Sequence, residues 1–182
     1  LEAYGISVTA VDIDPAVVRI ARERFRIGCE TVAADGRAFL ETDGRSFDAI
    51  VLDVFAGAEV PERLFTREMF ATAARRLAPG GILAIHLIGP PEHPAVRAVA
   101  RTLEAEFPHV AASRPTGGGL GAVWLFAGGD PLELGPWART ELARLGFSGR
   151  EMIAIDAAGA PIITDAGGGL AALAADLAAE YR

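Results

Sequence analysis

Short apolar runs rich in β-branched residues alternate along this chain with amphipathic segments of helical periodicity. The runs that predict strands are residues 6–11, 29–33, 47–52 and 81–87. The segments that predict helices are residues 15–25, 35–41, 66–77 and 94–107. Apolar strands joined by amphipathic helices indicate a parallel sheet that is covered on both faces. We therefore expect an α/β fold with a doubly wound, mostly parallel sheet, in a single domain that spans residues 1–182.

The pattern changes after the last of these helices. Residues 110–113 and 122–127 predict an antiparallel hairpin at an edge of the sheet, which is a common addition to such folds. Helices are expected at residues 136–145 and 170–181, and short edge segments at residues 152–155 and 161–163.

Composition excludes several classes of protein. The chain has 182 residues and is 51% hydrophobic, which suits one compact domain, and its formal net charge of −7 argues against a nucleic-acid binder. The single cysteine, Cys29, excludes an internal disulfide and a cysteine-clustered zinc site. Glycine and proline break every apolar run before it reaches the roughly 18 residues that a membrane helix needs. No signal-peptide pattern is found at the first residues, so we expect a cytoplasmic protein.

Three aspartates follow three successive predicted strands. They are Asp12, Asp35 and Asp53. Ligands of open parallel sheets bind outside the carboxyl ends of the strands. At that edge, Asp12 could accept hydrogen bonds from the two hydroxyls of a ribose, and Asp35 could accept one from an adenine amino group. Asp53 would lie closer to a reacting group.

Each of these side chains also has a purely structural interpretation. Asp14 precedes Pro15 and is expected to cap a helix, and Asp12 could serve the same turn. The role of Asp35 could be limited to a turn or a helix start, and Asp53 could have a purely structural role. His86 near a strand end could face the ligand or be an ordinary structural histidine. For Trp124 we expect sheet packing, with stacking on a substrate as the alternative.

Three segments carry a resemblance to a known family: VDIDPAVVRIARERF, AADGRAFL and FDAIVLDVFAGAEVPERLFTREMF. Together they resemble the class I S-adenosylmethionine-binding fold, which is Rossmann-like. More narrowly, the stretch from Asp53 to Pro61, followed by LFTREMF, is similar to the spermidine synthase (aminopropyltransferase) family. The resemblance is clear over residues 6–87 and looser beyond them.

The resemblance implies a role for each matching residue. Asp12, with its neighbour Ile13, would hold the ribose of S-adenosylmethionine or its decarboxylated form, and Asp35, with Gly36, would contact the adenine. Asp53 would be the catalytic base that accepts a proton from an attacking amine. The implied partners are a nucleoside co-substrate and a small amine, with no metal, in a homodimer.

The sequence departs from the family pattern at three places. The second acid that binds the amine has only Glu59 as a substitute, and the Thr-Asp-Asp segment of the family is here Thr164-Asp165-Ala166, one acid short. Asp165 is still expected to bind substrate. The first strand and its Gly-x-Gly loop should precede residues 1–5, so the chain resembles an N-terminally incomplete domain.

Three functional hypotheses follow. The first is aminopropyl transfer from decarboxylated S-adenosylmethionine to an amine, in a form that could be diverged or inactive. The second is a methyltransferase that acts on a small molecule with the same cofactor fold. The third is a non-catalytic nucleoside-binding or scaffold protein.

Overall fold

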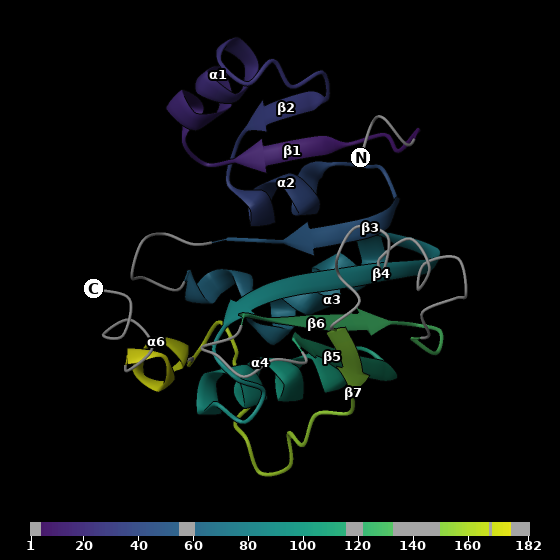
Figure 1. The fold of residues 1–182 in the computed structure, drawn as a ribbon, viewed down its shortest axis with the longest axis vertical. Helices are drawn as coiled ribbons and strands as arrows, with labels where there is room; N and C mark the ends of the chain where they lie inside the picture. The colour runs from purple at the N-terminus through teal and green to yellow at the C-terminus, as the bar shows by residue number, and fades with distance from the viewer. Residues whose placement is uncertain (1–4, 55–60, 116–121, 133–149, 168, 176–182) are drawn as a thin grey trace. The chain divides into compact units, whose positions relative to one another are not determined.

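The computed structural model describes residues 5–54, 61–115, 122–132, 150–167 and 169–175 (Figure 1). The chain divides into two compact units, Leu1–Gly44 and Arg45–Arg182. The single domain expected over residues 1–182 stays a prediction.

The first unit holds a two-stranded parallel sheet with a helix after each strand. Its elements are β1 (Thr9–Asp12), α1 (Pro15–Glu23), β2 (Glu30–Ala33) and α2 (Gly36–Thr42). Helix α1 begins as the sequence predicts, because Pro15 has the backbone angle of a first helical residue and the Asp14 carboxylate accepts the amide hydrogen of Ala16. All four predicted elements are therefore present, with small shifts at their ends.

The second unit is built on a five-stranded sheet in the order β3-β4-β6-β5-β7. Its elements are β3 (Phe47–Leu52), the 3-10 helix η2 (Glu62–Leu64), α3 (Arg67–Arg76), β4 (Leu77–Ile88), α4 (Pro94–Glu104), β5 (His109–Pro115), β6 (Ala122–Gly128), β7 (Arg150–Ile153) and α6 (Leu170–Leu173). Strands β3 and β4 are parallel, whereas β6 pairs antiparallel with β4 and with β5, and β7 pairs antiparallel with β5. The predicted α/β fold is thus confirmed, and the sheet of this unit is mixed, with the parallel pair of β3 and β4 on one side and antiparallel strands beyond it.

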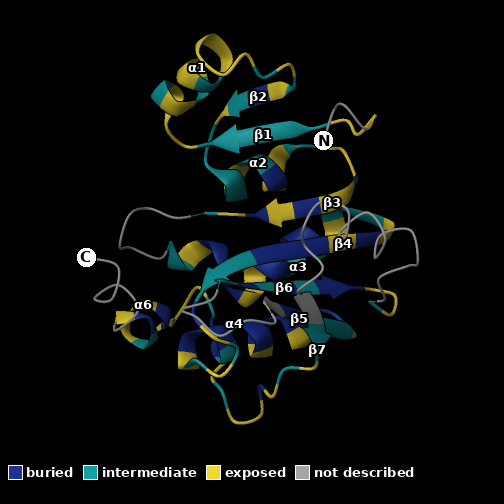
Figure 2. Cartoon of the chain, in the orientation of Figure 1, coloured by how far each residue is buried: buried dark blue, intermediate teal, exposed yellow. Residues whose placement is uncertain are grey.

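One face of this sheet forms the core of the second unit. In β6 the side chains of Val123, Leu125 and Ala127 are buried, while the residues between them are half-buried. Helix α3 packs against β4 and helix α4 against β5, and both helices contribute buried apolar side chains (Figure 2). The opposite face is partly open, since Val51 of β3 is 56% exposed and Ile82 of β4 is 38% exposed.

Strand β4 begins directly after α3, four residues earlier than expected, with Pro79 and two glycines inside it. Gly80 has a φ of 78°, which favours glycine. A Cβ on Gly81 would lie 2.8 Å from the carbonyl oxygen of Ala78 and 3.0 Å from that of Phe47. The glycines therefore allow a close approach of β3 and β4 where their register shifts.

The C-terminal half confirms part of the prediction. The antiparallel hairpin of β5 and β6 is present, but it lies one strand in from the edge because β7 pairs outside β5. Strand β7 corresponds to the edge segment expected at residues 152–155. The helix expected at residues 136–145 lies outside the described residues, and so do residues 176–181 of the helix expected at residues 170–181, whose first residues form α6 (Leu170–Leu173).

The prediction of a strand at residues 161–163 is wrong. The backbone of Ile163 pairs with helices instead of the sheet: its amide donates to Oγ1 of Thr102 at 3.0 Å, and its carbonyl accepts from the amide of Arg67 at 2.8 Å. The side chain of Arg67 donates to Glu106 at 2.6 Å, and this hydrogen bond, with the attraction of the carboxylate, raises the pKa of Arg67. The apolar run that suggested a strand is an extended segment held on α3 and α4.

We expect Thr102→Val to lower the free energy of unfolding by about 1–3 kcal/mol, because the buried amide of Ile163 would lose its acceptor. Urea unfolding measures the change. Thr42→Val is the matched control, since the Thr42 hydroxyl also donates to the carbonyl four residues earlier but is exposed. Equal losses in the two variants would contradict the role given to Thr102.

Candidate active site

Asp12 ends strand β1, as the sequence predicts, and its carboxylate shapes the turn that follows. Oδ1 accepts the amide hydrogen of Asp14 at 2.8 Å, and Asp14 in turn caps α1, so its expected cap role is confirmed. Among the described residues, no hydrogen-bond partner occupies Oδ2 of Asp12, and the contact of this carboxylate with a ribose stays a prediction. Ile13, the next residue, is 72% exposed.

Asp35 is the N-cap of α2. Its Oδ1 accepts the amide hydrogen of Ala38 at 2.9 Å, and Gly36 is the first residue of the helix. The parallel register places Asp12 opposite Ala33, two residues before Asp35, so both carboxylates follow the same edge of the small sheet. The structure thus shows the cap role of Asp35, and its contact with an adenine stays a prediction.

Asp53 directly follows β3 and lies beside His86 of β4. In the parallel register Leu52 pairs with Ile85, so Asp53 and His86 come next on neighbouring strands. Nδ1 of His86 and Oδ1 of Asp53 are 2.8 Å apart. A carboxylate can only accept, so Nδ1 carries the proton in this hydrogen bond when Asp53 is ionised. The side chain of Asp53 is 56% exposed and that of His86 is 23% exposed, which leaves the carboxylate accessible.

The imidazole of His86 also stacks on an indole. His86 pairs with Trp124 across β4 and β6, and their rings lie 4.6 Å apart with an interplanar angle of 13°. Trp124 in turn lies 6.4 Å from the ring of Phe126 on the same strand. The expected packing of Trp124 on the sheet is confirmed, and it includes this stack.

Sequence reasoning did not find the pair of Asp53 and His86. The signal was present, since FDAIVLD and GILAIHL are both apolar runs with one polar residue near the C-terminal end. Aligning the runs as parallel neighbours would place the carboxylate beside the imidazole. The register that makes this alignment unique is a tertiary property, which periodicity alone does not supply.

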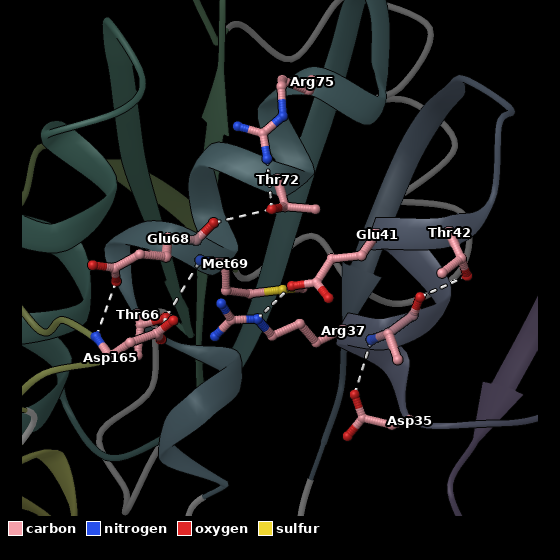
Figure 3. A network of polar contacts seen from close by, with 11 residues as sticks. Asp35, Arg37, Glu41, Thr42, Thr66, Glu68, Met69, Thr72, Arg75 and Asp165 are labelled. Carbon is pink, nitrogen blue, oxygen red and sulfur yellow. Dashed lines mark hydrogen bonds and ion pairs between the residues drawn. The ribbon is translucent and has the colours of Figure 1, made fainter.

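Asp165 belongs to a polar network at the N-terminus of α3 (Figure 3). Its Oδ1 accepts the hydroxyl hydrogen of Thr66 at 2.7 Å, and its amide donates to Oε2 of Glu68 at 3.0 Å. Thr66 is buried and caps α3 by accepting the amide hydrogen of Met69. The carboxylate predicted to bind substrate therefore has a structural partner in this helix start. Glu59, the other predicted substrate ligand, lies outside the described residues.

The predicted site residues fall in both units. Asp12, Ile13, Asp35 and Gly36 belong to the first, and Asp53 and Asp165 to the second. The meeting of the three strand-end aspartates at one edge stays a prediction. Within the described ranges, no group of three or more histidine, cysteine, aspartate or glutamate side chains is arranged to hold a metal ion. No described helix has the length and apolar character required to cross a membrane.

Comparison with known proteins places this arrangement in a class. Residues 1–81 match the family model described as Methyltransferase domain. Polyamine aminopropyltransferase 2 of Pseudomonas aeruginosa is 30% identical over 152 residues, which cover 74% of this chain and 42% of the relative. The N-terminal histidine N-methyltransferase of Emericella nidulans is 31% identical over 115 residues, which cover 59% of this chain and 21% of the relative. The chain thus spans less than half the length of these curated relatives.

A solved structure agrees with the sequence relatives. A probable spermidine synthase from Corynebacterium glutamicum superposes on 86% of this chain and 63% of its own, with a TM-score of 0.73 and 25% identity. The chain therefore has a class I methyltransferase fold. Within that class the fold is spermidine synthase-like, which confirms the resemblance seen in the sequence.

We expect Asp35→Ala to lower the free energy of unfolding by about 1 kcal/mol, because α2 would lose its N-cap. Asp35→Asn should be close to neutral, because an asparagine side chain caps a helix as well as aspartate does. Urea unfolding followed by circular dichroism compares the two. Unchanged stability of the alanine variant would show that the cap contributes nothing.

Proposed function

We propose that this chain is an aminopropyltransferase-like enzyme that transfers an aminopropyl group from decarboxylated S-adenosylmethionine to a small amine. The observation that carries the proposal is the accessible Asp53 carboxylate, held by His86 at the end of β3 in a spermidine synthase-like fold. The sequence relatives named as polyamine aminopropyltransferases support an amine as the acceptor. The activity, the substrates and the extent of the domain over residues 1–182 are all parts of this proposal.

The reaction needs a base because its acceptor is protonated at neutral pH. With an ordinary alkyl ammonium pKa of about 10.4, only about one amine in a few thousand is neutral at pH 7. Asp53 attracts the ammonium and accepts its proton. The neutral nitrogen then bonds to the carbon beside the sulfonium, and the carbon–sulfur bond breaks with its electron pair on sulfur. The nucleoside leaves as a neutral thioether.

Asp12 and Asp35 are proposed to hold the nucleoside, with Ile13 and Gly36 beside them. The second oxygen of Asp12 supports this role, since it can accept from a ribose hydroxyl while the first keeps the turn. Asp165 and Glu59 remain proposed ligands of the amine, with Asp165 sharing its carboxylate with Thr66. A homodimer, which the resemblance implies, a cytoplasmic location and the absence of a metal complete the proposal.

A methyltransferase is the second candidate. The match of residues 1–81 to the Methyltransferase domain and the N-methyltransferase of Emericella nidulans favour it. In that case the donor would be S-adenosylmethionine itself, and no base near Asp53 would be needed for an acceptor that is already neutral. The two functions differ in the nucleoside product, which is methylthioadenosine for aminopropyl transfer and S-adenosylhomocysteine for methyl transfer.

Calorimetry and mass spectrometry on the full chain test the proposal. Calorimetry compares the binding of methylthioadenosine, S-adenosylmethionine and its decarboxylated form. Mass spectrometry then follows the nucleoside product formed with a short diamine. Binding without turnover would support the non-catalytic hypothesis, and the absence of any nucleoside binding would contradict both transferase functions.

We expect Asp53→Asn to lower kcat for aminopropyl transfer by roughly 10²–10⁴-fold, because the amide cannot accept the proton. Affinity for methylthioadenosine should stay unchanged, since the proposed nucleoside ligands are Asp12 and Asp35. Asp48→Asn is the matched control, as Asp48 lies exposed on the same strand. Wild-type turnover in Asp53→Asn would remove Asp53 from the role of base.

A further inference from the structure

His86 is the one polar side chain in the apolar run from Gly81 to Ile88. An aliphatic side chain would complete this strand without the cost of removing an imidazole from water. The ring nevertheless occupies the position beside Asp53, with a hydrogen bond on one side and the Trp124 indole on the other. Such a placement calls for a reason beyond packing.

We propose that His86 is a positioning residue for Asp53. In this role Nδ1–H of His86 holds Oδ1 of the carboxylate and keeps Oδ2 turned toward the amine, while Trp124 fixes the plane of the imidazole. The inference rests on the proposed function and goes beyond it, because the resemblance assigns no role to this histidine.

The Asp53 carboxylate needs to be held because it is accessible. A side chain that is 56% exposed can take several rotamers, and a proton acceptor works only when it meets the reacting nitrogen at hydrogen-bond distance. Within the described ranges, His86 is the hydrogen-bond partner of Asp53, and it uses only Oδ1. Fixing one oxygen therefore orients the other without blocking it.

This role requires a particular net charge on the pair. With Asp53 ionised and the imidazole neutral in its Nδ1–H form, the pair has one net negative charge. That charge attracts an ammonium group to the end of β3. A protonated imidazole would cancel it, so the neutral ring is the form that serves the reaction.

The Trp124 indole supports the geometry of the imidazole. The two rings are nearly parallel, at 13°, and their centroids lie 4.6 Å apart, within the range of stacked rings. The cross-strand pairing of His86 with Trp124 fixes the backbone positions of both. The hydrogen bond and the stack thus restrain the imidazole from two directions.

Two variants separate the hydrogen bond from the stack. His86→Phe keeps a ring against Trp124 but removes the donor, and we expect kcat to fall by roughly 10- to 100-fold, as for a displaced catalytic group. KM for the amine and the nucleoside should change little. His86→Asn places an amide donor close to the position of Nδ1 and should recover most of the lost kcat. His109→Phe, on β5 of the same sheet, is the matched control.

The outcomes of this comparison are distinct. If His86 has only a structural role, both substitutions should lower the thermal midpoint of unfolding, and His86→Asn should not recover kcat. If wild-type protein transfers the aminopropyl group and His86→Phe does so at an unchanged kcat, the inference is overturned and the proposed function stands. If wild-type protein forms no transfer product, the proposed function is contradicted, and so is the positioning role of His86, which depends on it.

A spectroscopic measurement tests the contact without turnover. Nitrogen-15 NMR of histidine-labelled protein should show His86 as the Nδ1–H tautomer, with a proton protected from exchange with water. In Asp53→Ala this protection should be lost, while the signals of His93 and His109 stay in place. An Nε2–H tautomer in the wild-type protein, or a signal unaffected by Asp53→Ala, would overturn the inference.

Discussion

The parallel pairing of β3 with β4 is the constraint on which the candidate active site depends. Its register sets Leu52 beside Ile85, and the next residue on each strand is the polar one. A shift of one residue would turn His86 to the core face and leave Asp53 without its partner. The buried side chains of Leu52 and Ile85 make such a shift costly, so the apolar core secures the geometry of the polar pair.

Local signals in the sequence predicted most of the elements. Strand β3 has the expected bounds, and Asp14 with Pro15 marks the start of α1. These signals act within a few residues, through periodicity, β-branching and capping, so one sequence is enough to detect them. The same reasoning predicted the hairpin of β5 and β6, since alternation of apolar side chains along β6 follows from its buried face.

The errors share a physical cause, which is that they concern long-range contacts. The apolar segment around Ile163 has the composition of a strand, yet Thr102 and Arg67 satisfy its backbone from two helices. The position of the hairpin within the sheet and the pairing of Asp53 with His86 likewise depend on which strands become neighbours. Periodicity shows which face of an element is apolar, but it does not show what that face meets.

The strand-end aspartates show that structural and functional interpretations of one carboxylate are compatible. In Asp12 and Asp35 one oxygen accepts a backbone amide at a turn or a helix start, and in Asp53 one oxygen accepts from an imidazole. A carboxylate has two oxygens and about four acceptor positions, so one local hydrogen bond does not exhaust its acceptor capacity. The local bond instead orients the side chain in advance, which lowers the entropic cost of binding a ligand. A helix cap after a strand of this fold is therefore weak evidence against a binding role.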